Sequence, residues 1–561
     1  MTEMYDVCII GSGAGAGPVA YELSKAGYKV IVLEKGEWLK EADFTKDEMA
    51  CCRRDTYTPL LKDESHVIEE KGKNGWVAES NKESGWSFWN GNIVGGSSNF
   101  MSGYFHRSKP VDFKLLSEFG PIEGANIVDW PIDYNEMEPY FDKVEKVVGV
   151  SGKVTPHKHL EPRSSVDFPQ PPTRENIFGE LIDNAGKKLN YTPINMPRAI
   201  LSQPLSNRSS CVYTGYCGSY GCTTKAKGSS RAALLDPAVE SGNCTILPNA
   251  MVYKLESNND GKVEFARYYD SMGHSQKIQA KIFVVACQAV ESSRLLLLSK
   301  SKMHPNGIGN NSGQLGKNLI FSAGGIGGAT FHRDDFGDTV FKKMKEHGTF
   351  VNRALQDWYT IEDKTSFERP MKGGTVDFLM SHSNPIRRAS RLKRTDGQLT
   401  WGKELKDKLS YNFKDTRRLE FEVFCDWLPT DDCYVTLDEN ETDKWGTPVA
   451  KIRINNHPHD LKVGKYLAKK TEALLKELGG KNISSSISGS PPANLMAGGC
   501  RFGDNEETSV LDRNCKIHTC PNVYVSDGSF MPTGGSVTFT WTIYANAFRV
   551  ADKIINQLKK T

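Results

Sequence analysis

Two apolar runs near the start of the chain flank a glycine-rich turn and a segment with helical spacing. Residues 7–10 and 30–33 are unbroken apolar runs, which are typical of parallel strands buried on both faces. Between them, the apolar residues of 19–26 recur at helical spacing, and Gly27 follows as a residue that can end a helix. The pattern predicts a strand, a helix and a second strand in that order.

Later segments extend this pattern. Residues 246–256 predict a strand, and residues 282–298 predict an apolar strand, a short polar turn and a leucine-rich helix. We expect the second of these strands to return to the first sheet. Residues 421–454 alternate apolar and polar positions between turn signals, which predicts antiparallel strands. The proline-containing residues 151–175 show no periodicity and predict a linker or a surface excursion.

Composition and charge exclude several classes of function. The chain has 561 residues, of which 38% are hydrophobic, and its net charge is 71 − 68 = +3. That charge is too small for a nucleic-acid footprint. No apolar run reaches the roughly 18 residues of a membrane span, and the start of the chain carries no targeting pattern. We therefore expect a cytoplasmic protein without a membrane segment of its own, although export together with a signal-bearing partner stays open.

The glycine turn matches a dinucleotide-binding pattern. Gly11, Gly13 and Ala16 occupy the three positions of G-x-G-x-x-G/A, and Glu34 follows Gly11 by 23 residues. The glycines allow a tight turn and a close approach to a pyrophosphate, which the helix N-terminus also attracts. A carboxylate at the end of the second strand accepts ribose hydroxyls. The pattern favours FAD or NAD over NADP.

Four motifs in a fixed order resemble the glucose–methanol–choline (GMC) oxidoreductase family. Besides the glycine turn, they are the loop Gly-Gly-Ser-Ser-Asn at 95–99, the strand and helix of 282–298, and the turn-rich segment with an Asp after a strand in 521–552. The stretch 129–152 is typical of the branch that contains the gluconate and fructose dehydrogenase flavin subunits.

The resemblance implies an α/β, Rossmann-like, doubly wound FAD-binding domain interleaved with an α+β substrate domain that has an antiparallel sheet. The FAD-binding domain would comprise residues 1–110, 210–325 and 485–561. The substrate domain would comprise 111–209 and 326–484. In this family such a sheet forms the floor of the substrate pocket.

The resemblance also assigns cofactor-binding residues. Some relatives attach the flavin covalently through a His in the 95–99 segment, but Phe100 stands there, so we expect non-covalent FAD. The resemblance implies that the pyrophosphate is held by Gly11, Gly13 and Gly15, the adenosine ribose by Glu34 and the adenine by Val252. It places Gly96, Ser97 and Asn99 against the flavin and its ribityl chain, and it closes the ribityl–phosphate end with Asp527 and Gly528.

Three cysteines in a glycine-rich segment are a candidate metal site. Cys211, Cys217 and Cys222 are spaced like thiolates that converge on one centre. The resemblance implies a 3Fe-4S cluster, which would pass electrons to a protein acceptor and indicate a dehydrogenase. The second spacing is one residue longer than expected. Zinc, a disulfide or free thiols are open alternatives.

The family's catalytic pair is absent from this chain. The usual His position, three residues before the Gly-Gly-Cys-Arg-Phe-Gly motif, holds Leu495 beside Asn494, and the second position holds Thr538. Leucine cannot take a proton, and threonine is a poor base. Asn494, Thr538 and His106 are therefore the catalytic candidates. The other histidines considered as a base are His382, His457 and His459, whereas His518 is interpreted as structural.

The sequence as a whole predicts an FAD-dependent oxidoreductase. Its substrate would be the CH–OH group of a sugar, polyol or similar small polar alcohol, with hydride passing to the flavin. The alternative is a flavoprotein with other chemistry, a lyase, an isomerase or a light-driven enzyme, because the catalytic His and Asn are missing. The basic residues 385–408 indicate an acidic substrate or partner, or a solvated loop.

Overall fold

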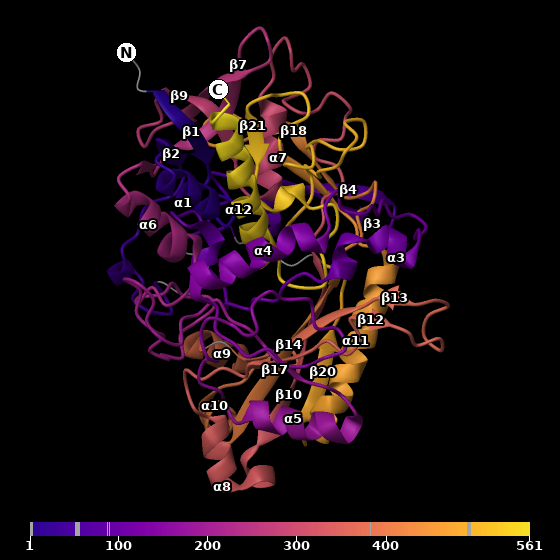
Figure 1. Ribbon diagram of the computed structural model, residues 1–561. Coiled ribbons are helices and arrows are strands. Elements are labelled where there is room, and N and C mark those ends of the chain that lie inside the picture. Colours follow the sequence, from indigo (N-terminus) through magenta and orange to yellow (C-terminus); the bar gives the residue numbers. More distant parts are fainter. Residues whose placement is uncertain are drawn as a thin grey trace.

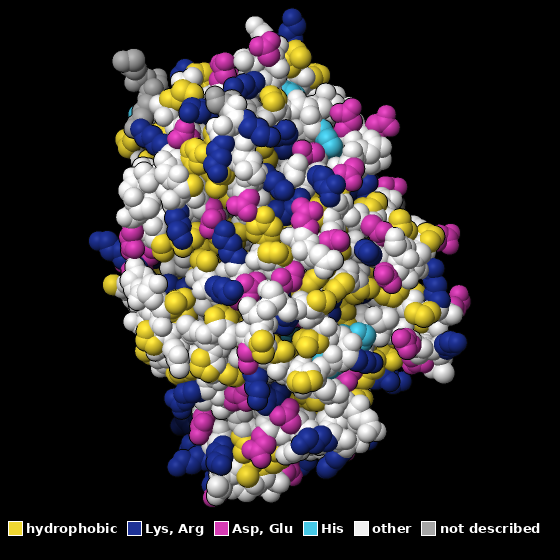
Figure 2. Space-filling view, in the orientation of Figure 1, with side chains coloured by type: hydrophobic (Ala, Val, Ile, Leu, Met, Phe, Trp, Pro, Cys, Tyr) yellow, Lys and Arg dark blue, Asp and Glu magenta, His cyan; other side chains and the backbone are white. Residues whose placement is uncertain are grey.

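The computed structural model describes residues 4–560 except 51–56, 87, 89, 382 and 491–494. The molecule is elongated, with both chain ends and helices α1 and α12 towards one end and helices α5, α8 and α10 towards the other (Figure 1). Acidic and basic side chains are interspersed over the face shown in Figure 2, as the small net charge predicts. None of the helices in the described part of the chain has the length and apolar character that crossing a bilayer requires.

A seven-stranded sheet forms the first layer. Strands β6, β2, β1 and β9 run parallel to one another, β21 pairs in parallel with β9, and β8 and β7 extend the sheet antiparallel. Its strands are β1 (Met4–Ile10), β2 (Val30–Leu33), β6 (Cys244–Leu247), β7 (Met251–Ser257), β8 (Val263–Tyr269), β9 (Ser275–Val285) and β21 (Val523–Val525). Helix α1 (Gly17–Lys25) follows β1, α7 (Ala289–Leu298) follows β9, and α12 (Phe539–Leu558) packs on α1. The predicted strand–helix–strand unit and the returning strand are confirmed.

A six-stranded antiparallel sheet forms the second layer, in the order β20-β10-β17-β14-β11-β5. Its strands are β5 (Ile194–Asn195), β10 (Ser322–His332), β11 (Arg353–Leu355), β14 (Gly374–Met380), β17 (Thr416–Asp426) and β20 (Lys481–Ser486). Helix α11 (Pro458–Glu477) covers one face, where the thiol of Cys425 lies close to Gly464. Because side chains alternate along a strand, Glu420 and Glu422 leave β17 on the opposite face.

A smaller sheet crosses the predicted domain division. β18 (Tyr434–Thr442) and β19 (Pro448–Ile454) are antiparallel, as predicted for this region, and β19 pairs in parallel with β3 (Val67–Gly72), which pairs with β4 (Gly75–Ser80). Residues 67–80 and 434–454, which the resemblance placed in different domains, therefore share one sheet. The remaining domain boundaries stay a prediction.

The remaining elements are short strand pairs and helices that connect these layers. They are β12 (Thr360–Ile361), β13 (Met371–Lys372), β15 (Arg394–Thr395), β16 (Gln398–Leu399), α2 (Asn81–Ser84), α3 (Leu115–Phe119), α4 (Tyr134–Val144), α5 (Phe178–Leu189), α6 (Asp236–Glu240), α8 (Arg333–Met344), α9 (Pro385–Leu392) and α10 (Gly402–Lys414).

A buried ion cluster joins the second layer to the segment before α12. Lys372 pairs with Asp112, lies 3.5 Å from Asp426 at the end of β17, and donates a hydrogen bond of 2.8 Å to Ser536. Burial alone would lower the pKa of Lys372, but the charges of Asp112 and Asp426 outweigh it and raise that pKa above its ordinary value. Four distant chain segments therefore meet around one ammonium group.

Replacing Lys372 by Met should destabilise the protein by about 3–5 kcal/mol, because two buried carboxylates would lose their compensating charge. The free energy of unfolding from denaturant titration measures this. The matched control is Lys188→Met, since Lys188 pairs with Glu477 at the surface, with side chains 69% and 33% exposed. That change should cost less than about 1 kcal/mol. An equal loss of stability in both variants would contradict the conclusion that Lys372 compensates two buried carboxylates.

Candidate functional site

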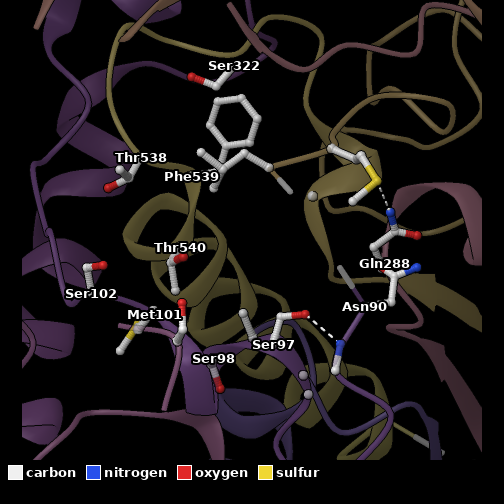
Figure 3. Close-up of a pocket in the computed structure, with 18 of the residues that line it drawn as sticks. Asn90, Ser97, Ser98, Met101, Ser102, Gln288, Ser322, Thr538, Phe539 and Thr540 are labelled. Carbon is white, nitrogen blue, oxygen red and sulfur yellow. Dashed lines mark hydrogen bonds between the residues drawn. The ribbon is translucent and has the colours of Figure 1, made fainter. Parts of the chain in front are cut away.

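A cavity of about 1120 Å³ extends from the glycine turn after β1 to the face of the six-stranded sheet that α11 leaves uncovered. Residues of the turn, the 96–104 segment, the start of α7, the 527–528 turn and the start of α12 line it. Figure 3 shows its central part, where Thr538, Phe539 and Thr540 lie opposite Gln288 and Asn90. The cavity therefore spans both layers.

The three glycines of the turn have different neighbours. Gly11 has a φ of +90°, and a Cβ there would lie 2.4 Å from the carbonyl oxygen of Ala286, so only glycine fits. A Cβ on Gly15 would lie 2.7 Å from the backbone of Asp527. A Cβ on Gly13 would meet no atom within 4 Å, because Gly13 faces the cavity. The turn thus combines two tight contacts with one open position.

Glu34 lies at the end of β2 and borders the cavity. Its carboxylate accepts hydrogen bonds from the Ser12 hydroxyl at 2.5 Å and from the Gly36 N–H at 2.8 Å. Burial raises the pKa of Glu34 despite these bonds. The Ser12 hydroxyl also accepts the Gly95 N–H at 2.9 Å, which ties the loop of 95–99 to the turn.

The loop of 95–99 brings some of its predicted residues to the cavity and turns others away. Gly96 and Ser97 line the cavity, and the Ser97 hydroxyl accepts the Gly91 N–H at 2.8 Å (Figure 3). Asn99 is buried instead, and its amide donates to the carbonyl oxygens of Val94 and Gly96, both at 3.0 Å. Asn99 therefore shapes the loop, and the structure does not place it in the cavity.

Asp527 joins three segments at the middle of the cavity. One carboxylate oxygen accepts the Gln288 N–H at 3.0 Å and the Ser292 hydroxyl, and the other accepts the Ser529 N–H at 2.9 Å. The neighbouring Ser526 donates to the carbonyl oxygen of Gly15 at 2.8 Å. Burial raises the pKa of Asp527. The two ends of the chain are thus bonded together beside the cavity.

These features fit an FAD molecule. Gly13 leaves room for a pyrophosphate beside the start of α1, and Glu34 stands one strand away at the position of an adenosine ribose. Of the ten predicted cofactor-binding residues, all except Asn99 border the cavity. They are Gly11, Gly13, Gly15, Glu34, Gly96, Ser97, Val252, Asp527 and Gly528.

The predicted catalytic residues have other roles or lie elsewhere. The Thr538 hydroxyl borders the cavity but donates its proton to the carbonyl oxygen of Tyr104 at 3.0 Å. His106 is bonded to Asp377 at 2.8 Å and borders a separate cavity of about 40 Å³, so the structure does not bring it to the flavin cavity. Asn494 lies outside the described residues. Neither Thr538 nor His106 is placed to act as the predicted base.

Leu495 stands where the family has its histidine, and its backbone is strained. It borders the cavity with a φ of +62°, a left-handed conformation that costs a residue with a Cβ about 1–2 kcal/mol. Such strain is found preferentially at functional sites.

The remaining predicted histidines lie away from the cavity or are not described. His457 is bonded to the carbonyl oxygen of Glu123 at 2.9 Å, and its Nδ1 accepts the His459 N–H. His382 lies outside the described residues. His518 is bonded to Ser509 at 2.9 Å, which agrees with its structural interpretation.

Cys211, Cys217 and Cys222 are half-buried and unbridged. Burial, together with smaller contributions from Cys217 and Cys222, raises the pKa of Cys211 to about 11. Burial also acts to raise the pKa of Cys222, but the charge of Lys227 and hydrogen bonds leave it below its ordinary value. Within the described residues, no group of three or more His, Cys, Asp or Glu side chains is arranged to hold a metal ion. The arrangement therefore does not support the predicted cluster.

Several cavity residues were not predicted from the sequence. Gln288 has a φ of +82°, and its amide donates to the Met496 sulfur at 2.5 Å (Figure 3). Tyr104 and Glu422 line the part of the cavity beside Thr538 and the second sheet. Gln288 directly follows an apolar strand, so its place at the cavity could have been predicted from the sequence. No local sequence pattern distinguishes Glu422 as a cavity residue.

Comparison with protein families gives two matches. The N-terminal model of the GMC oxidoreductases matches residues 66–321, and the C-terminal model of the same family matches residues 429–547. Over 99% of this chain and 92% of the relative, the sequence is 30% identical to paromamine 6'-oxidase from Streptomyces fradiae.

Two further relatives and a solved structure extend the comparison. The chain is 28% identical to 2-methyl-1,2-propanediol dehydrogenase from Mycolicibacterium austroafricanum, over 98% of this chain and 95% of the relative. It is 23% identical to the gluconate 2-dehydrogenase flavoprotein of Pantoea cypripedii, over 99% and 94%. Formate oxidase from Aspergillus oryzae superimposes with a TM-score of 0.65 at 15% identity, covering 100% of both chains. That likeness confirms the predicted fold class.

Gly13→Ala and Gly15→Ala should separate cofactor binding from folding. A methyl group on Gly13 enters the space assigned to the pyrophosphate, so FAD affinity should fall about tenfold or more while the free energy of unfolding without FAD stays unchanged. A methyl group on Gly15 clashes with the Asp527 backbone and should cost about 1–3 kcal/mol of stability. Flavin fluorescence titration and chemical denaturation measure the two effects. Unchanged FAD affinity in Gly13→Ala would contradict the assignment.

Proposed function

Because the chain belongs to the GMC oxidoreductase family, we propose that it is an FAD-dependent oxidoreductase that acts on the CH–OH group of a sugar, polyol or similar small polar alcohol. The observation that carries the proposal is the single cavity that joins the glycine turn and Glu34 to the uncovered face of the six-stranded sheet. One space thus accommodates a dinucleotide and, beside it, a small molecule.

The chain's own residues hold the cofactor in this proposal. The Gly13 backbone admits the pyrophosphate, the Glu34 carboxylate accepts ribose hydroxyls, and the 527–528 turn closes the opposite side. When bound, FAD accepts a hydride from the carbinol carbon of the substrate. Phe100 is fully buried and stacks on Tyr57 at 5.0 Å, which supports non-covalent binding because no nucleophile stands at that position.

The substrate part of the cavity favours a small polar molecule. Ser102, Ser322 and Thr540 contribute hydroxyl groups to its wall, and Phe539 contributes an aromatic face (Figure 3). Hydroxyl groups can donate to and accept from the hydroxyls of a polyol. The relatives include paromamine 6'-oxidase and 2-methyl-1,2-propanediol dehydrogenase, which is consistent with this class.

The route of the electrons away from the flavin is a narrower part of the proposal. A 3Fe-4S cluster on Cys211, Cys217 and Cys222, with an electron-accepting protein partner, rests on the cysteine spacing alone. The alternative chemistry of a lyase, isomerase or light-driven enzyme draws on the missing histidine alone, and the relatives named above are oxidases and dehydrogenases.

An anaerobic absorption spectrum tests the proposed reaction. We expect purified protein to show bound oxidised flavin, and we expect at least one of paromamine, 2-methyl-1,2-propanediol, gluconate and fructose to bleach the long-wavelength flavin band. Dithionite provides the control for full reduction. The proposal would be overturned if dithionite reduces the flavin but no member of a broad panel of sugars and polyols does.

Iron and acid-labile sulfide assays test the cluster separately. If the three cysteines hold a 3Fe-4S cluster, wild-type protein prepared anaerobically should contain about three iron atoms per chain, and Cys222→Ser should lose them. Cys244→Ser, at a buried cysteine of the first sheet, is the matched control and should retain the iron. Protein without iron would remove the cluster and leave the flavin chemistry standing.

A further inference from the structure

The oxidation of an alcohol needs a group that takes the hydroxyl proton, and the two family positions do not provide one. Leu495 has no titratable atom, and Thr538 donates its proton to the Tyr104 carbonyl oxygen. The acceptor must therefore come from elsewhere in the cavity wall. Five carboxylates border the cavity, namely Glu34, Glu291, Glu420, Glu422 and Asp527.

Three of these carboxylates have other roles at the cofactor end. Glu34 is bonded to Ser12, and Asp527 holds the chain ends together. Glu291 is bonded to His66 at 2.8 Å and lies 3.3 Å from Arg294, next to Lys35. These groups border the part of the cavity assigned to the dinucleotide, where bound FAD would separate them from the substrate. Among the carboxylates of the described residues, the two glutamates of β17 remain.

Glu420 and Glu422 differ in their distance from the end of β17. The strand ends at Asp426, which accepts the N–H of Gly535 just before α12, so the end of β17 lies closest to Thr538. Glu422 is closer to that end than Glu420 by two residues, about 7 Å along a strand. Glu420 also lies 3.4 Å from Arg418, in a pair about one-third exposed. Glu422 is half-buried and borders the same cavity.

Glu422 also lies beside Tyr104, the residue that Thr538 holds in place. Burial raises the pKa of Tyr104 well above its ordinary value, and the charge of Glu422 raises it further. The Tyr104 hydroxyl therefore stays protonated and can donate a hydrogen bond to a substrate oxygen but cannot accept its proton. Tyr104 lines the cavity and its backbone carbonyl oxygen accepts the Thr538 hydroxyl at 3.0 Å, so Tyr104 connects the surroundings of Glu422 to the residue before α12.

Several ionisable groups surround Glu422. Asp377 on β14 is its register partner, so the two carboxylates leave the same face of the sheet. A neighbouring negative charge favours the protonated form of a carboxyl group. The other ionisable groups around this position are His106, which is bonded to Asp377, Tyr104, Arg198, Cys217, Glu420 and Arg418, and the arginines of α9 that line the same cavity are Arg387, Arg388 and Arg391. Arg198 lies over the Tyr104 ring at 4.9 Å and offsets part of the negative charge.

We propose that Glu422 is the catalytic base that accepts the hydroxyl proton of the alcohol, an inference that rests on the proposed function. The O–H bond breaks and its proton passes to the Glu422 carboxylate. The carbinol C–H bond breaks with its electron pair, which leaves as hydride to the bound FAD, and a C=O bond forms. Protonated Glu422 then loses its proton to solvent through the open cavity.

The first test compares Glu422→Gln with Glu420→Gln, a matched change two residues away on the same strand face. With an alcohol that reduces the wild-type flavin, E422Q should reduce on the order of 10²-fold more slowly, whereas E420Q should lose far less of the rate. The wild-type rate should fall as pH is lowered through the titration of a carboxyl group, and E422Q should lose that fall. Glu422→Asp should recover part of the rate. FAD content and thermal stability confirm that each variant is folded and loaded.

The second test does not use turnover. Acetate cannot give up a hydride from a carbinol carbon, and its binding perturbs the absorption of oxidised flavin if it enters the cavity. The charge of Glu422 opposes anion binding, so E422Q should bind acetate about tenfold more tightly than wild type, an effect of about 1.4 kcal/mol. E420Q, whose partner is Arg418, should change acetate affinity much less.

The outcomes separate this inference from the proposed function. If no alcohol reduces the wild-type flavin, the proposed function fails, and the acetate titration still shows whether Glu422 is an ionised group of the cavity. If the wild-type flavin is reduced and E422Q keeps both its rate and its pH dependence, Glu422 is not the base, although the proposed function stands. Equal acetate affinities in wild type and E422Q would likewise overturn the inference.

Discussion

The close approach of the Gly15 backbone to Ser526 and Asp527 is the constraint on which the site depends. A methyl group on Gly15 would lie 2.7 Å from Asp527, and the Ser526 hydroxyl bonds to the Gly15 carbonyl oxygen. The Asp527 carboxylate also accepts hydrogen bonds from Gln288 and Ser292 at the start of α7. These contacts join chain segments about 500 residues apart, so both sides of the cofactor cavity exist only in the folded protein.

Buried charges as well as packing hold the six-stranded sheet against the contact between Gly15 and residues 526–527. Lys372, Asp112 and Asp426 form a buried cluster that also bonds to Ser536, just before α12. The end of β17 is thereby placed next to the residues that follow the 527–528 turn. The uncovered face of the sheet consequently forms the far wall of the cavity.

The missing histidine has a structural consequence. Leu495 keeps a strained backbone at the histidine position, and Thr538 uses its hydroxyl to hold Tyr104. Both positions therefore border the cavity, and neither side chain is an ionisable base. Carboxylates on the opposite wall face the same space, and the inference about Glu422 places the proton acceptor on the substrate sheet, separate from the cofactor layer.

The sequence by itself determined the features that depend on neighbouring residues. The glycine turn, the strand–helix–strand unit and Glu34 were predicted from local spacing and side-chain size, whereas the Asp527 turn was predicted from the resemblance to the family. Only the tertiary structure decided that Asn99 turns away from the cavity, that His106 is bonded to Asp377, and that residues 67–80 join the sheet of 434–454. It also decided that Glu422 lies beside Tyr104. These placements follow from strand register and long-range packing, which no local pattern specifies.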